Sequence, residues 1–149
     1  MPSKTLVIVD MQPIFKASRN PDTIIAVTNE IITARKNNDA VMFVEYRGSG
    51  RTHTGFNSLI RGYEHKATIR KQKDDGSQEI INALRRRNFP TQTLRICGVN
   101  TDCCVWSTVW GLLNRMSYTK IEVVKNGCHC EDIYFDWRSF LKHPNLRLV

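Results

Sequence analysis

The chain has 149 residues, of which 41% are hydrophobic, a proportion ordinary for a soluble globular protein. This length predicts a single domain, residues 1–149, which can bury a core without disulfides or structural metals. The 22 Lys and Arg residues exceed the 14 Asp and Glu residues, and the formal net charge is +8. The positive charge is scattered and no nucleic-acid-binding motif accompanies it, so we expect no nucleic-acid partner.

The sequence carries no recognisable export or membrane signal. The apolar run after Lys4 is short and is interrupted by Asp10, and no run approaches membrane-spanning length. The five cysteines are an odd number, which argues against a disulfide framework and for a reducing compartment. We therefore expect a cytoplasmic protein without membrane contact.

The amino-terminal half alternates strand and helix patterns. Leu6–Val9 and Val41–Val44 are continuous apolar runs, typical of strands buried on both faces of a parallel sheet. Between them, Asp22 can cap a helix. The apolar stripe of that helix would consist of Ile24, Ile25, Val27, Thr28, Ile31 and Ile32. The segment Arg47–Glu64 predicts a long functional loop or a partly ordered insert, and Ala67–Ile69 is a weaker strand candidate.

The carboxyl-terminal half continues this alternation. Strands are predicted at Leu94–Cys97 and Ile121–Val124, with an edge strand at Leu146–Val149. Helices are predicted after Ser77, behind Val105 and over Ile133–Leu141. The run Arg85–Arg87 lies in the last turn of its helix, where cations complement the helix dipole. Strands that alternate with helices predict a three-layer α/β/α fold with a mostly parallel, Rossmann-like sheet.

Three reactive residues follow predicted strands. Open α/β sheets place functional sites beyond the carboxyl ends of their strands, where Asp10, Lys71 and Cys104 are expected. Cys104 also lies at a helix start, whose partial positive charge favours a thiolate and can stabilise an oxyanion. A cysteine nucleophile is the leading hypothesis. Taken singly, each residue has a structural alternative. Asp10 would be a solvated strand-end carboxylate or a helix cap, Lys71 a surface lysine, and Cys104 a small buried core residue.

Together, three segments form a pattern. They are Val7-Ile8-Val9-Asp10-Met11-Gln12, Thr68-Ile69-Arg70-Lys71 and Gly98-Val99-Asn100-Thr101-Asp102-Cys103-Cys104-Val105. The pattern resembles the isochorismatase-like cysteine hydrolase family, which includes nicotinamidases, over nearly the whole chain. The resemblance implies that Cys104, immediately before Val105, is the nucleophile rather than Cys103. It implies that Asp10 is the general acid and base, and that Lys71 completes the catalytic set.

The resemblance also implies how the site works. A cis peptide between Val99 and Asn100 would aim the Asn100 N–H, with that of Cys104, at a developing oxyanion. Lys71 and the helix start would favour the Cys104 thiolate. Asp10 would carry the thiol proton to the leaving ammonia. The implied reaction hydrolyses an amide, carbamoyl or ureido C–N bond of a small molecule through a thioester.

One region departs from the family. Nicotinamidases of this family carry a metal site with the pattern D-x-H-x-x-x-H, followed shortly by S-F. Aligning His53 with the last ligand puts Arg47 at the Asp position and Ser49 at the first His. One remaining ligand is too few for a closed site, so we expect no metal and no cofactor. Without that metal, substrates lacking a pyridine ring are favoured, and Arg47, Arg51 or Arg70 becomes a candidate to bind a carboxylate or ureido oxygen.

Other features of the site are also predictions. Candidate pocket residues are Phe15, Tyr46, Arg47, His53 and Phe56, with Tyr134 and Trp137 as further aromatic candidates. Phe15 ranks first because it follows Asp10 by about one turn, although core packing is the commoner fate of such side chains. Because family members are commonly oligomeric, the resemblance implies a homo-oligomer, a dimer or tetramer.

Three alternatives stay open. The chain is a true nicotinamidase that converts nicotinamide to nicotinate, or it is a catalytically silent binding homologue of the same fold. The segment Cys128-His129-Cys130 suggests a structural zinc site, but its spacing lacks the usual pair of cysteines two residues apart. The resemblance instead aligns Val124–Cys128 with the loop after the fifth strand, near the rim of the active site.

Overall fold

The computed structural model describes residues 2–149, and in that range six strands form one sheet. Every neighbouring pair of strands is parallel, and the order is β3-β2-β1-β4-β5-β6. The strands are β1 (Thr5–Val9), β2 (Ala40–Tyr46), β3 (Lys66–Lys71), β4 (Thr93–Val99), β5 (Lys120–His129) and β6 (Leu146–Leu148). The two weaker strand candidates of the sequence are therefore confirmed as β3 and β6, which form the sheet edges.

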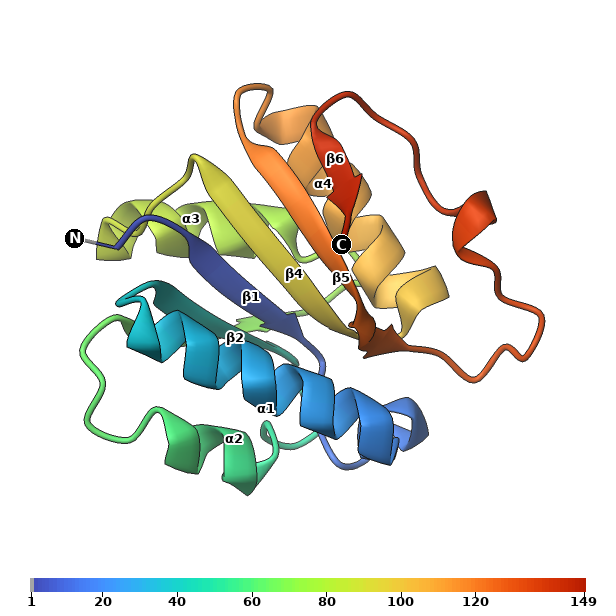
Figure 1. Ribbon diagram of the computed structural model, residues 1–149, viewed down its shortest axis with the longest axis horizontal. Coiled ribbons are helices and arrows are strands. Elements are labelled where there is room, and N and C mark those ends of the chain that lie inside the picture. The colour runs from blue at the N-terminus through green and yellow to red at the C-terminus, as the bar shows by residue number, and fades with distance from the viewer. Residues whose placement is uncertain (1) are drawn as a thin grey trace.

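Helices cover both faces of the sheet (Figure 1), which confirms the three-layer α/β/α prediction. They are α1 (Pro21–Lys36), α2 (Thr54–Leu59), α3 (Ser77–Arg87) and α4 (Trp106–Arg115). Helices α1 and α2 lie on one face, and α3 and α4 lie on the other. Within residues 2–149, no helix combines the length and the apolar composition that a bilayer crossing requires.

The amino end of α1 differs from the prediction. Asn20, not Asp22, is the cap, and its side chain accepts a hydrogen bond from the Thr23 N–H at 3.0 Å. Pro21 occupies the first helical position, where its missing N–H costs nothing, and Asp22 lies in the first turn. The prediction of Asp22 as the cap was wrong because Asn and Asp are equally good caps and lie two residues apart.

Two other local predictions were wrong in part. Ile25 and Ile32 are 60% and 51% exposed, because they lie on the face of α1 that is turned away from the sheet. The segment Ile133–Leu141 contains only the 3₁₀ turn Trp137–Ser139. Its apolar residues do not share one buried face, since Ile133 is 86% exposed whereas Phe140, later in the same segment, is buried.

The centre of the sheet positions the candidate site. β1 is buried along its whole length and lies between β2 and β4, where the direction of strand addition reverses. Such a reversal opens a crevice at the carboxyl ends of the strands. At this end Val9 is paired with Val44 and Gly98. Gly98 has a φ of +129°, and a Cβ there would overlap the Val9 carbonyl, so only glycine lets β4 approach β1 here.

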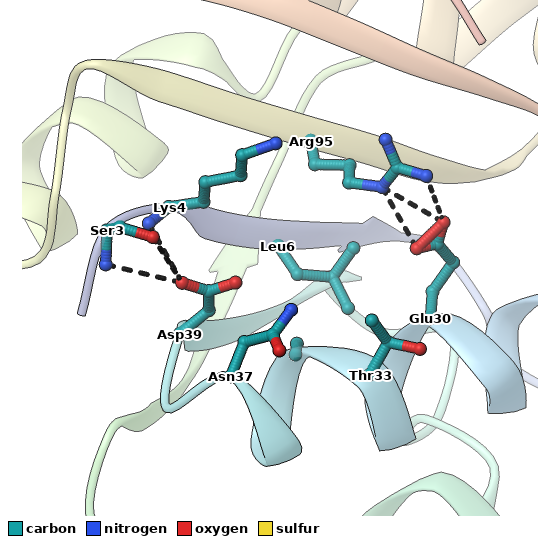
Figure 2. Close-up of a pocket in the computed structure, with 9 residues that line it drawn as sticks. Ser3, Lys4, Leu6, Glu30, Thr33, Asn37, Asp39 and Arg95 are labelled. Carbon is teal, nitrogen blue, oxygen red and sulfur yellow. Dashed lines mark hydrogen bonds and ion pairs between the residues drawn. The ribbon is translucent and has the colours of Figure 1, made fainter.

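A polar crevice of about 220 Å³ lies beside α1, toward the amino ends of the strands (Figure 2). Arg95 pairs with Glu30 at 2.6 Å and with Glu122 at 3.5 Å, and Lys4 pairs with Glu122 at 3.1 Å. Asp39 accepts hydrogen bonds from the backbone N–H groups of residues 3 and 4. Each charged group that lines this crevice therefore has a partner within the chain.

Candidate active site

Asp10 and Lys71 form a buried ion pair at the carboxyl edge of the sheet. Asp10 follows β1 and Lys71 ends β3, so the lysine side chain spans the intervening β2. Its Nζ lies 3.1 Å from Asp10 Oδ2, and the two side chains are 0% and 3% exposed. The ammonium also donates to the Lys73 carbonyl at 2.9 Å and lies 4.1 Å from the centre of the Tyr46 ring. Three partners thus hold the lysine head in place.

Asp10 is held in an unusual conformation. Its φ is +53°, in the left-handed region that non-glycine residues seldom adopt, and its N–H donates to the Val44 carbonyl at 2.9 Å. Its Oδ1 is buried and has no hydrogen-bond partner in the chain from residue 2 onward. Burial raises the pKa of Asp10, although the positive charge of Lys71 lowers it. Asp10 therefore combines affinity for a proton with an oxygen free to receive one.

Cys104 lies beside this pair. It belongs to the π-helical turn Thr101–Val105 that connects β4 to α4, and it is 7% exposed. Its thiol interacts with both Asp10 and Lys71. Burial, and then the negative charge of Asp10, raises the pKa of the thiol well above its ordinary range, and Lys71 only partly offsets this. Lys71 therefore favours the thiolate as expected, but burial and the Asp10 charge outweigh it.

The backbone before Cys104 has the expected arrangement. The peptide bond between Val99 and Asn100 is cis. The Asn100 carbonyl accepts hydrogen bonds from the N–H groups of Cys103 and Val105, both at 3.1 Å. The Cys104 N–H lies between these two donors in the chain. An oxyanion hole formed by the N–H groups of Asn100 and Cys104 stays a prediction.

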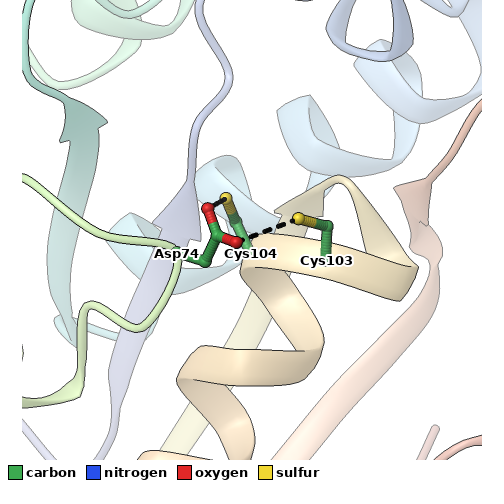
Figure 3. Close-up of side chains that lie close together, drawn as sticks. All are labelled: Asp74, Cys103 and Cys104. Carbon is green, nitrogen blue, oxygen red and sulfur yellow. Dashed lines mark hydrogen bonds between the residues drawn. The ribbon is translucent and has the colours of Figure 1, made fainter.

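Asp74 is a neighbour of Cys104 that the sequence did not single out. Its carboxylate accepts a hydrogen bond from the Cys104 thiol at 3.7 Å and another from the Cys103 thiol at 3.5 Å (Figure 3). The only sequence signal was the pair Asp74-Asp75 before a predicted helix, which suits a helix cap equally well. The cap residue is Gly76, and the Asp75 side chain, just before it, accepts from the Ser77 N–H at 2.8 Å.

One side chain of α4 ties down the loop that carries Asp74. The Thr108 hydroxyl, on α4, accepts from the Gly76 N–H at 3.0 Å and donates to the Asp74 carbonyl at 3.2 Å. A Cβ at Gly76 would lie 2.7 Å from Cδ of Lys71. Glycine at this position therefore leaves the space that the buried lysine side chain occupies.

The candidate pocket residues lie partly at the site and partly in the core. Tyr46 contacts the ammonium of Lys71, and Phe15 packs edge-to-face against Tyr46 with ring centres 6.4 Å apart. Phe56 is 2% exposed and belongs to the hydrophobic core. His53 packs against Phe56 with ring centres 5.6 Å apart. The structure thus brings Phe15 and Tyr46 to the ion pair and directs Phe56 into the core.

The residues that correspond to the family's metal site do not fit a metal. Arg47 is exposed, and its guanidinium offers no lone pair. Ser49 supplies only a hydroxyl. His53 Nε2 lies 3.1 Å from both the hydroxyl and the carbonyl oxygen of Ser18, and these contacts engage the remaining candidate ligand. The donor set that this metal requires is therefore not present in the loop.

Side-chain hydrogen bonds hold this loop instead. Gln12 donates to the carbonyls of Tyr46 and Gly50 at 3.0 and 2.8 Å, and accepts from the Tyr46 N–H at 2.7 Å. The buried Glu45 accepts from both the N–H and the hydroxyl of Thr52, at 2.7 and 2.9 Å. The alternative metal segment, Cys128–Cys130, contributes to no group of three close metal-binding side chains within residues 2–149.

No protein-family model and no curated protein matches this sequence. Solved structures nevertheless match the fold. The nicotinamidase SaPncA from Staphylococcus aureus is 23% identical, with a TM-score of 0.71 over 87% of this chain and 84% of that chain. N-carbamoylsarcosine amidase from Thermoplasma acidophilum is 22% identical, with a TM-score of 0.70 over 91% of this chain and 88% of that chain.

A third structure matches almost end to end. An isochorismatase family protein is 17% identical, with a TM-score of 0.71 over 98% of this chain and 97% of that chain. These identities are low, so the likeness concerns the backbone architecture. The protein has the isochorismatase-like fold.

Proposed function

We propose that the protein hydrolyses a small amide, carbamoyl or ureido C–N bond through a thioester on Cys104. The observation that carries this proposal is the convergence of Cys104 on the buried pair of Asp10 and Lys71, whose charged atoms are 3.1 Å apart. The fold neighbours named as a nicotinamidase and an N-carbamoylsarcosine amidase support the same reaction class.

In the first half-reaction, Sγ of Cys104 attacks the carbonyl carbon while its proton passes to the unpartnered Oδ1 of Asp10. Because burial and Asp10 raise the pKa of the thiol, its proton leaves as the sulfur attacks. The N–H groups of Asn100 and Cys104 stabilise the resulting oxyanion. The C–N bond then breaks, and the leaving nitrogen takes the proton from Asp10 and departs as ammonia or an amine.

In the second half-reaction, water attacks the thioester carbonyl and Asp10 removes its proton. The C–S bond breaks, and the Cys104 sulfur regains that proton as a thiol. Lys71 keeps Asp10 ionised between proton transfers and holds the carboxylate in position. No step requires a metal, in agreement with a loop whose residues do not fit one.

The arginines near the site indicate the preferred substrate. Nε of Arg70 lies 3.6 Å from the buried Glu45 carboxylate, which already occupies it. Arg47 and Arg51 are exposed at the same edge of the sheet. The backbone N–H of Arg47 donates to the backbone carbonyl of Lys71 at 2.8 Å. An acyl substrate with a carboxylate suits these two side chains better than a neutral pyridine amide.

The test is ammonia release from nicotinamide, an N-carbamoyl amino acid and a ureido acid, measured with a chelator present. We expect turnover of a carboxylate-bearing substrate and a loss of about a thousandfold or more in Cys104→Ala. Cys130→Ser is the matched control, because serine can keep the hydrogen bond that this thiol donates to the Asp132 carbonyl. A thioester adduct should map to Cys104 by fragment mass spectrometry.

Each outcome discriminates among the candidate functions. Undiminished activity of Cys104→Ala removes the nucleophile assignment. A folded protein that turns over no substrate but is thermally stabilised by one is a binding homologue. Turnover of nicotinamide alone identifies the alternative, a true nicotinamidase. Slow alkylation by iodoacetamide does not discriminate, because the raised pKa of the Cys104 thiol makes it slow in an active enzyme as well.

We also propose that the protein functions as a cytoplasmic homo-oligomer, a dimer or tetramer. Trp106 and Trp110 on α4 are 37% and 45% exposed and stack on one another, which leaves an apolar surface for a second copy. All five cysteines are free, as expected in a reducing compartment. Sedimentation of the purified protein measures the oligomeric state, and a monomer at all concentrations contradicts the proposal.

A further inference from the structure

We propose that Asp74, Cys103 and Cys104 form a binding site for a thiophilic divalent cation such as Zn²⁺, and that the bound cation sequesters Cys104. Their ligand atoms all lie within 4.8 Å of one another, and no other such group of three occurs in residues 2–149. The binding itself is independent of the proposed function, whereas its inhibitory effect rests on that function.

The distances within this group suit tetrahedral coordination. The Asp74 carboxylate faces both sulfurs, at 3.5 Å from Cys103 and 3.7 Å from Cys104 (Figure 3). With Zn–S and Zn–O distances of about 2.3 and 2.1 Å, neighbouring donors around a tetrahedral zinc are about 3.6 Å apart. The 3.5 Å distance runs to Oδ2 and the 3.7 Å distance to Oδ1, so each sulfur already lies at about the donor spacing of a zinc site from one carboxylate oxygen. Thiol protons now bridge these donors.

The site is set by the fold before any cation arrives. Both cysteines belong to the turn Thr101–Val105, and Asp74 comes from a loop that Thr108 ties to α4 through two hydrogen bonds. The donors therefore come from two segments that are fixed relative to one another. A preset donor group loses less conformational entropy on binding than one that must assemble.

The chemistry of the donors selects the class of cation. Two cysteines and one carboxylate suit zinc and other thiophilic cations rather than Mg²⁺ or Ca²⁺. Binding releases both thiol protons, so the dithiolate and the carboxylate together contribute three negative charges against two positive ones. Asp74 and Cys103 are exposed, which gives the cation access from solvent and leaves a position for water.

Some neighbouring charges favour a cation at this site and others oppose it. Lys71 interacts with the Cys104 thiol and opposes a cation, while Asp10 beside it favours one. Asp102 is exposed and acts on Cys103 as a further negative charge. The positive charge of Lys71 is already paired with Asp10 at 3.1 Å, so it repels a cation only weakly and the remaining negative charge of Asp102 attracts one.

The test titrates Zn²⁺ against a chromophoric chelator, and Co²⁺ by its sulfur-to-metal charge-transfer absorption. We expect one equivalent per chain, and a loss of affinity of about a hundredfold or more in both Cys103→Ser and Asp74→Asn. Asp102→Asn is the matched control, because it removes an equal charge from an adjacent exposed position outside the donor set. Its affinity should change by less than about threefold.

Two results overturn the site: absence of the charge-transfer band, or equal affinity in wild type and Cys103→Ser. The inhibition is tested separately, since stoichiometric Zn²⁺ should abolish ammonia release and a chelator should restore it. Binding through Cys103 and Asp74 without any amide turnover retains the site and refutes the proposed function. Turnover that Zn²⁺ leaves unchanged retains the function and refutes the sequestration.

Discussion

Two ionic clusters at different places on the sheet are built on different principles. In the outer cluster beside α1, Arg95 bridges Glu30 and Glu122, and the paired side chains are 13–43% exposed. In the inner cluster, Lys71 and Asp10 are almost completely buried, and Oδ1 of Asp10 has no partner within residues 2–149. The outer cluster satisfies its charges, whereas the inner one leaves a carboxylate oxygen unsatisfied.

The two clusters differ in what their burial costs. Partly exposed charges keep much of their hydration, so the outer pairs cost little and stabilise modestly. The inner pair bears a large desolvation cost. This cost appears in Asp10, whose pKa is raised by burial even with Lys71 beside it. A buried group with a perturbed pKa and a free oxygen is typical of a reactive site rather than a structural pair.

The largest expected effect comes from separating the inner pair. Lys71→Met leaves the buried Asp10 carboxylate uncompensated, so it should destabilise the fold by about 3–5 kcal/mol. Asp10→Asn mimics the neutral carboxyl that burial favours, so it should cost less. Each should also lower kcat/KM by about a thousandfold or more, because in the proposed mechanism Asp10 transfers the proton and Lys71 positions the Asp10 carboxylate. The double variant should recover most of the stability and none of the activity. Urea unfolding and ammonia release measure the two properties.

A double variant as unstable as Lys71→Met would contradict this comparison. It would mean that packing, rather than the uncompensated charge, determines the contribution of the pair to stability.

The next effect is steric. Gly76→Ala puts a methyl group 2.7 Å from Cδ of Lys71, and the lysine cannot yield because its head is held by three partners. We expect a loss of about 1–3 kcal/mol in unfolding free energy, with lower kcat. Gly55→Ala is the control, since no atom lies within 4 Å of its added Cβ, and alanine should stabilise α2 by about 0.5–1 kcal/mol. Equal effects of the two substitutions would refute the contact.

The pH dependence of stability follows from Asp10. Burial raises its pKa above the ordinary value of 3.8, so the folded protein keeps a proton that the unfolded chain has already released. The Asp10 contribution to stability therefore falls as pH rises from the unfolded pKa through the folded one. Wild type should lose this contribution over that range, and the difference from Asp10→Asn isolates it from other carboxylates.

The pH dependence of kcat/KM should also depend on Asp10. The acid limb of kcat/KM should lie above the pH at which an ordinary aspartate ionises, because Asp10 must be a carboxylate to accept the thiol proton. A limb at the ordinary aspartate value would indicate that another group is the base.

The smallest effect is expected in the outer cluster. Glu30→Gln removes the charge that pairs with Arg95 at 2.6 Å but keeps the shape of the side chain. We expect a loss of about 1 kcal/mol and less than about a twofold change in kcat/KM. A large loss of activity in this variant would show that the two clusters are coupled through β1.

The sequence predicted those parts of the molecule that depend on local pattern. Apolar runs such as Leu6–Val9 and Val41–Val44 indicate burial on both faces, which is typical of a parallel sheet covered by helices. Predictions failed where two local signals compete, as at Asn20 and Asp22, or where apolar residues share no face, as in Ile133–Leu141. In these places, contacts with other parts of the chain determine the local structure.

The sequence by itself determined the layer architecture and the candidates Asp10, Lys71 and Cys104, because periodicity and motif spacing are local properties. Only the tertiary structure decided that Lys71 reaches across β2 to Asp10, and that Asp74 meets both thiols. Burial in the folded site also raises the pKa of the Cys104 thiol. The physical reason is that strand order, contacts between distant segments and desolvation arise only when the chain is packed.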